Sequence, residues 1–140
     1  MSAERGVRNA ELQTDDSSLR RDSVSEPLKV RTKALAVRVI KLVDALPTKR
    51  SAEAISRQLV RSAMSVGANY RAACRARSPA EFCAKLGIVE EEADETTYWL
   101  ELLVDAELVP AAKLADLRRE VNEITAMVIA SIKTARGRKR

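Results

Sequence analysis

Apolar residues recur at steps of three and four residues in four separate stretches of the chain, which is the period of an amphipathic helix. The clearest repeat runs from Phe82 to Leu103, with the alternating steps of a bundle helix. Similar repeats cover residues 28–46, 51–74 and 110–135. Because the joining segments are short, consecutive helices should run antiparallel. The pattern therefore predicts an all-α fold, an antiparallel up-down four-helix bundle.

Start and stop signals indicate where the predicted helices begin and end. Pro47 should end the first helix, because proline cannot continue the helical hydrogen bonding. Ser51 is the expected N-cap of the second helix. The third has the clearest start, since Ser78 is followed by a proline and then, at the third helical position, by Glu81. Gly67 lies on a face of small residues, which predicts that another helix approaches closely there.

The two ends of the chain differ in composition from the predicted bundle. Residues 1–27 are polar and show no sustained apolar period, so we expect a disordered N-terminal tail. Residues 28–135 form the predicted bundle. Residues 136–140 form a short basic C-terminal tail. The chain is thus expected to hold one folded domain between two tails.

Composition excludes several kinds of site. Histidine is absent from all 140 residues, which excludes Ser-His-Asp and Cys-His catalysis and zinc sites of the usual Cys/His spacing. The two cysteines, Cys74 and Cys83, are expected to be reduced. No apolar run is long enough to span a membrane, and the N-terminal residues lack an apolar signal core. We therefore expect a cytoplasmic protein that is not an enzyme, binds no membrane and has no cofactor or metal.

Charge is divided unequally between neighbouring helices. The net charge of +5 includes +6 over residues 49–77 and −7 over residues 78–106. These two helices can attract each other within one subunit or between subunits. Arginine also suits phosphate, because its planar fork donates two parallel hydrogen bonds. The candidate nucleic-acid-binding residues are Arg57, Arg61, Arg71, Arg75, Arg77, Lys133, Arg136, Arg138, Lys139 and Arg140. The alternatives are pairing with the acidic helix and, for the C-terminal tail, a solubilising role.

Acidic residues cluster in the third helix between Glu90 and Glu95. Paired carboxylates can perform acid–base chemistry or hold a hard cation, but no partner with metal-ligand spacing is evident. We therefore expect a solvated or ion-pairing face, and the role of this cluster stays open. Glu95 lies beside the apolar seam, where a buried charge needs partners. Arg61 and Asn69 are its candidates, forming with it a structural polar network; a recognition pocket is the alternative.

Several segments carry a family resemblance: Gln58–Ala72, Ser78–Phe82, Lys85–Ile88 and Glu95–Leu100. In this order and spacing, they resemble the four-helix-bundle proteins encoded by intervening sequences of bacterial large-subunit ribosomal RNA genes. That family includes the accessory variability determinant proteins of diversity-generating retroelements. The resemblance covers residues 28–132. Asn69 is followed here by Tyr-Arg-Ala-Ala, where one common branch has Ile-Ala-Glu-Gly, so the branch stays open between a retroelement and a ribosomal RNA insertion.

The resemblance implies a subunit that assembles into a homopentameric barrel and has no known enzymatic activity. In the retroelement branch, the barrel binds a reverse transcriptase and nucleic acid through basic surfaces. Residues and resemblance together predict a non-enzymatic homo-oligomeric scaffold that binds RNA, DNA or a reverse transcriptase. The alternative is a protein-binding regulatory or assembly module with no nucleic-acid role.

Overall fold

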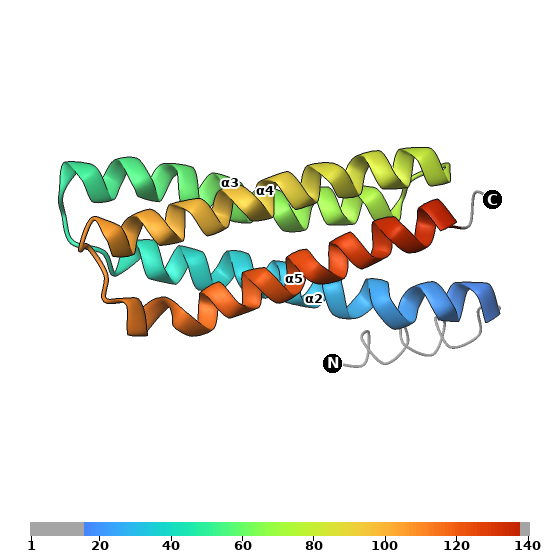
Figure 1. The fold of residues 1–140 in the computed structure, drawn as a ribbon, viewed down its shortest axis with the longest axis horizontal. Helices are drawn as coiled ribbons and strands as arrows, with labels where there is room; N and C mark the ends of the chain where they lie inside the picture. The colour runs from blue at the N-terminus through green and yellow to red at the C-terminus, as the bar shows by residue number, and fades with distance from the viewer. Residues whose placement is uncertain (1–15, 138–140) are drawn as a thin grey trace, which may run out of the picture.

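The computed structural model describes the backbone of residues 16–137 and the side chains of residues 25–137. Its elements are the helices α2 (Asp16–Asp44), α3 (Arg50–Cys74), α4 (Pro79–Asp105) and α5 (Ala111–Gly137). Consecutive helices run in opposite directions, and the last residues of α3 and α5 lie at the same end of the bundle as the start of α4 (Figure 1). The predicted all-α antiparallel four-helix bundle is confirmed.

The first helix is longer than the apolar pattern indicated. The sequence predicted a start near residue 28, whereas α2 begins at Asp16 and contains Pro27. Proline removes one backbone donor and therefore one helical hydrogen bond, but its backbone angle is compatible with a helix, so the helix can continue on both sides. Residues 1–15 of the predicted N-terminal tail and residues 138–140 of the predicted basic tail lie outside the described residues.

The starts of α3 and α4 show one wrong and one confirmed capping prediction. Lys49, and not Ser51, occupies the N-cap of α3, and its side chain makes no capping hydrogen bond. At α4, the Ser78 Oγ accepts a hydrogen bond from the Glu81 backbone N–H at 3.1 Å, as predicted. The Glu81 carboxylate in turn accepts from the Arg77 backbone N–H at 3.0 Å, so Ser78 and Glu81 together satisfy two backbone donors near this helix start.

The core is formed by one apolar stripe from each helix. All four helices contribute fully buried side chains, among them Leu35, Val39, Leu59, Val66, Leu100, Leu103, Val121 and Ile124. Gly67 lets α2 and α3 approach each other, because a Cβ built there lies 3.4 Å from the Thr32 carbonyl oxygen and 3.4 Å from its Oγ1. The predicted close approach at Gly67 is therefore present. Within residues 16–137, no helix is both long and apolar enough to cross a membrane.

A polar cluster that the sequence reasoning missed joins α2 to α5. The Arg31 guanidinium donates to both carboxylate oxygens of Glu120, from Nε at 3.0 Å and from Nη2 at 2.6 Å. The same Nη2 lies 2.7 Å from Glu123 Oε2, and Nη1 lies 3.2 Å from the Met127 sulfur. Because 89 residues separate Arg31 from Glu120, helix periodicity could not pair them. This Arg31 clamp connects the first and last helices of the bundle.

Candidate nucleic-acid interface

Five arginines share the outer face of α3: Arg50, Arg57, Arg61, Arg71 and Arg75. At 100° per residue they fall within an arc of about 80°, and all five are exposed. The opposite face carries the buried residues of this helix, including Ile55, Leu59 and Val66. We call these five residues the arginine face of α3. Arg50 was not among the predicted nucleic-acid-binding residues, because the predicted N-cap at Ser51 placed Arg50 before the helix.

The arginine face makes no ion pair with the acidic helix beside it. In residues 25–137, the ion pairs connect Lys29 with Glu26, Arg31 with two residues of α5, Arg118 with Glu101 and Arg119 with Asp116. The α3 and α4 helices pack along their length, yet none of these pairs joins them. Direct pairing inside the subunit therefore does not account for the arginines of α3.

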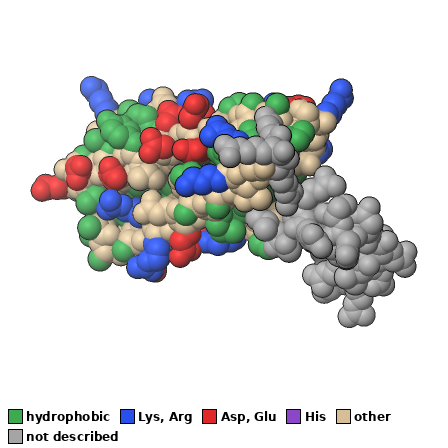
Figure 2. Space-filling model, turned by 45° about the vertical axis from the view of Figure 1, so that its right-hand side comes forward, with side chains coloured by type: hydrophobic (Ala, Val, Ile, Leu, Met, Phe, Trp, Pro, Cys, Tyr) green, Lys and Arg blue, Asp and Glu red, His purple; other side chains and the backbone are tan. Residues whose placement is uncertain are grey.

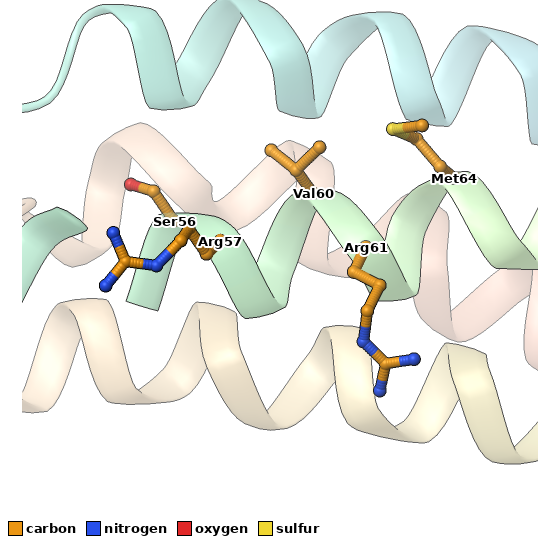
Figure 3. A pocket seen from close by; sticks show the side chains of 5 residues that line it. All are labelled: Ser56, Arg57, Val60, Arg61 and Met64. Carbon is orange, nitrogen blue, oxygen red and sulfur yellow. The ribbon is translucent and has the colours of Figure 1, made fainter. Parts of the chain in front are cut away.

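Arg57 and Arg61 lie in a different part of the bundle from the other predicted arginines. They line a shallow depression on α3 together with Ser56, Val60 and Met64. In Figure 3, Val60 and Met64 point toward α2, whereas Arg61 extends toward α4. Ten residues of helix separate Arg61 from Arg71, which corresponds to about 15 Å. The predicted set of arginines is thus divided into two groups.

The second group lies at one end of the bundle. Because α3 and α5 both finish there, the fold brings together residues that are about 60 positions apart in the sequence (Figure 1). This basic end consists of exposed side chains: Arg71, Arg75, Arg77, Lys133 and Arg136. The predicted residues Arg138, Lys139 and Arg140 lie outside the described residues, directly after the end of α5.

Cations at the ends of α3 and α5 also stabilise these helices. The carbonyl end of a helix carries partial negative charge, which a nearby Lys or Arg stabilises by about 0.3–1 kcal/mol. Arg71 lies in the last turn of α3 and Arg136 in the last turn of α5. Arg75 and Arg77 follow α3 in the chain. The face of the molecule in Figure 2 mixes acidic, basic and apolar side chains, and its Lys and Arg side chains are spread among the others.

The predicted polar network of Arg61, Asn69 and Glu95 is not present among the described side chains. The Asn69 amide donates to the Ser65 carbonyl of its own helix at 2.9 Å, and no hydrogen bond joins Asn69 to Arg61 or Glu95. Asn69 therefore satisfies its donor locally, as short polar side chains often do in a helix.

The buried polar link between α3 and α4 is instead a pair of hydroxyl groups. Thr96 donates to Ser62 Oγ at 2.9 Å and also lies 2.8 Å from the Glu92 carbonyl oxygen. Ser62 lies 3.1 Å from the Leu59 carbonyl oxygen and can donate to it. Both side chains are fully buried. Both residues occupy positions in the apolar repeats of their helices. This position was the only feature of the sequence that indicated burial of the two hydroxyl groups between the helices.

Glu92 is the residue of the acidic cluster whose charge the fold disfavours. Its Oε2 atom is buried and has no hydrogen-bond partner among the described residues, and the same holds for the Trp99 indole nitrogen, seven residues further along α4. Burial, with a smaller contribution from the neighbouring Glu95 carboxylate, raises the pKa of Glu92, and Arg61 opposes this increase. Within residues 25–137, no group of three or more acidic or cysteine side chains is arranged to hold a metal ion.

We expect Glu92→Gln to raise the free energy of unfolding at pH 7 by about 1 kcal/mol, because the buried carboxylate loses its charge without losing its shape. A carboxyl group whose pKa is raised by folding destabilises the fold above that pKa and not below it. The gain should therefore shrink as the pH falls through the pKa of Glu92. Urea unfolding at pH 7 and pH 4 measures this. Asp94→Asn, an exposed change on the same helix, should leave the stability within about 0.5 kcal/mol. Equal effects of the two variants would contradict the prediction.

Comparisons with known proteins agree with this fold and with the resemblance of the sequence. A crystal structure of a protein of unknown function from the S23 ribosomal protein family of Bacteroides thetaiotaomicron has a TM-score of 0.73 and 36% sequence identity. The similarity covers 78% of this chain and 97% of that chain. No curated protein matches this chain. The 23S rRNA-intervening sequence proteins match residues 27–130, and the chain therefore belongs to this family.

Proposed function

We propose that this protein is a non-enzymatic, self-assembling helical scaffold that binds the phosphate backbone of structured RNA through its basic end. The observation that carries the proposal is the convergence of Arg71, Arg75 and Arg77 with Lys133 and Arg136 at one end of the bundle. The RNA-related family adds support. Pentameric assembly, DNA as a ligand and a reverse transcriptase as a partner stay predictions of the resemblance.

The chemistry of the basic end favours phosphate contacts over base recognition. Arginine donates from a planar fork that matches two phosphate oxygens, whereas lysine acts as a point charge. The aromatic residues near this end, Tyr70 and Phe82, are buried and half-buried, whereas reading of unpaired bases usually relies on exposed aromatic side chains that stack on them. Binding should therefore depend on RNA shape and charge more than on its sequence.

The binding of a labelled RNA hairpin across a salt series tests the proposal. If one subunit neutralises about five phosphates, its affinity should fall by two to three orders of magnitude between roughly 50 and 200 mM salt. In the triple variant Arg71→Gln, Arg75→Gln and Arg77→Gln, binding should weaken. Its slope of log affinity against log salt should become shallower by about one for each lost contact.

The matched control changes lysines on another helix. Lys33→Gln with Lys41→Gln removes charge from exposed positions of α2 and should change RNA binding much less. Absence of RNA binding by the unmodified protein at 50 mM salt would refute the proposal. So would a triple variant that binds with the same affinity and the same salt slope as the unmodified protein.

A protein-binding module without a nucleic-acid role is the second candidate. The observation that favours it is an apolar line on the outer face of α2, where Val30, Val37 and Ile40 are 66%, 43% and 41% exposed. Exposed apolar surface of this kind often marks a protein contact. A single protein partner that is retained after nuclease treatment and in high salt, with no RNA binding, would support this candidate.

A further inference from the structure

Two outer faces of the bundle carry opposite charges and make no ion pair with each other within residues 25–137. The α3 patch consists of Arg57, Arg61 and Met64, and the α4 patch consists of Ile88, Glu91 and Glu95. Met64 is 50% exposed and Ile88 is 39% exposed. Arg57, Arg61 and Glu91 are exposed, and Glu95 is half-buried. Each patch therefore combines one apolar residue with two like charges.

The spacing of the two patches matches when the helices are aligned antiparallel. In the α3 patch, two arginines four residues apart are followed after three residues by the apolar side chain. In the α4 patch, the apolar side chain is followed after three residues by two glutamates four residues apart. One antiparallel alignment therefore places Arg57 opposite Glu95, Arg61 opposite Glu91, and Met64 opposite Ile88.

The subunit itself does not use this alignment. Inside the bundle, the buried Ser62–Thr96 hydrogen bond shows which residues of α3 and α4 face each other. That alignment differs by about one and two-thirds turns from the one that pairs the patches. It also leaves the arginines without an ion pair to α4 in the described part of the chain. The complementary spacing is thus available to a second copy.

We infer that the α3 patch of one copy docks on the α4 patch of a second copy, with these two helices antiparallel. The inference rests on the self-assembly part of the proposed function and specifies the surfaces involved. Because the two patches are different surfaces, the contact is head-to-tail, and each copy retains one free patch for a further copy. Such contacts build a ring where the rotation between copies closes, and an open filament where it does not.

This docking has a consequence for the basic end. The α3 helix of the first copy runs antiparallel to α4 of the second, and α4 of the second runs antiparallel to its own α3. Neighbouring copies therefore point the same way, and their basic ends gather on one side of the assembly. Several basic ends on one side would hold a single RNA with greater avidity than one subunit can.

Reciprocal charge reversal tests the inference. The first variant carries Arg57→Glu and Arg61→Glu, and the second carries Glu91→Arg and Glu95→Arg. Each should lose assembly, because the two faces that meet then have the same charge. Its mass by light scattering at micromolar concentration should fall to that of the subunit, 15.4 kDa. The third variant combines all four changes, which restores opposite charges at the contact, and should regain the mass of the unmodified protein.

Two controls separate this contact from other causes of dissociation. Lys33→Glu with Lys41→Glu changes the net charge by as much as the first variant does and should leave the mass unchanged. Circular dichroism should show the same helix content in every variant. An oligomer whose mass is unaffected by either double reversal would overturn the inference and leave self-assembly intact, as would a combined variant that stays folded and monomeric. A monomeric unmodified protein would overturn both the inference and the assembly part of the proposed function.

Discussion

The variant Gly67→Val should lower the free energy of unfolding by about 2 kcal/mol. A Cβ added at this glycine would lie 3.4 Å from the Thr32 carbonyl oxygen and 3.5 Å from the Thr32 carbonyl carbon, both of which belong to the α2 backbone. The two γ carbons of valine extend beyond the Cβ, so α2 must move away from α3. Because backbone atoms cannot rotate away as a flexible side chain does, the displacement should also disturb the core residues around Thr32.

Gly87 provides the matched control, since it is also a glycine inside a long helix. A Cβ built at Gly87 has no neighbour within 4 Å. There, Gly87→Ala should stabilise the protein by up to about 1 kcal/mol through helix propensity alone, and Gly87→Val should be nearly neutral. Urea unfolding of Gly67→Val, Gly87→Ala and Gly87→Val at one protein concentration compares the two positions. A valine tolerated equally at both would show that α2 does not pack closely on Gly67.

The variant Arg31→Ala should destabilise the protein by about 2 kcal/mol, the scale of charge-assisted hydrogen bonds that leave a buried partner behind. The Glu120 side chain is only 19% exposed, so it loses its hydrogen bonds where water can replace them only in part. The exposed ion pair of Arg119 and Asp116 is the control, with side chains 66% and 81% exposed. Arg119→Ala should cost no more than about 0.5 kcal/mol. Similar losses in the two variants would contradict a special role for the Arg31 clamp.

The Arg31 clamp also predicts the direction of a pH effect. The hydrogen bonds from Arg31 hold the pKa of Glu120 below its ordinary value, while burial acts in the opposite direction with a smaller effect. A carboxyl group whose pKa is lowered by folding stabilises the fold above its unfolded pKa, and this contribution disappears as the pH falls through the folded pKa. The loss of stability on acidification from about pH 5 should therefore be smaller in Arg31→Ala than in the unmodified protein.

The features that sequence predicted best depend on local interactions. The apolar repeats predicted four helices and their antiparallel order, and the start of α4 followed from Ser78, Pro79 and Glu81. The errors lay at two helix starts, where the structure departs from what the capping residue or the proline in the sequence indicated. Lys49 precedes α3 without a side-chain cap, although Ser51 was available two residues later. The helix α2 continues through Pro27 because a single missing hydrogen bond does not end a helix.

The candidate interface was predicted only as a set of residue types. The sequence contains every arginine of the basic end, but it could not show that Arg71, Arg75 and Arg77 lie at the same end as Lys133 and Arg136. That grouping depends on where α5 finishes relative to α3, which is decided by the packing of the bundle. The expected network of Arg61, Asn69 and Glu95 is absent among the described side chains, because the Asn69 amide donates to the Ser65 carbonyl oxygen of its own helix.

The sequence by itself predicted the four helices, the face of small residues around Gly67 and the unequal charges of α3 and α4, because each depends on residues within a few turns of one another. The tertiary structure alone decided which distant side chains meet. It placed Arg31 against Glu120 and Ser62 against Thr96, gathered the basic end from two helices, and left the α3 and α4 patches without an ion pair between them in the described part of the chain. Helix periodicity specifies which face of a helix is buried, but the register between helices is set by the packing of the whole core.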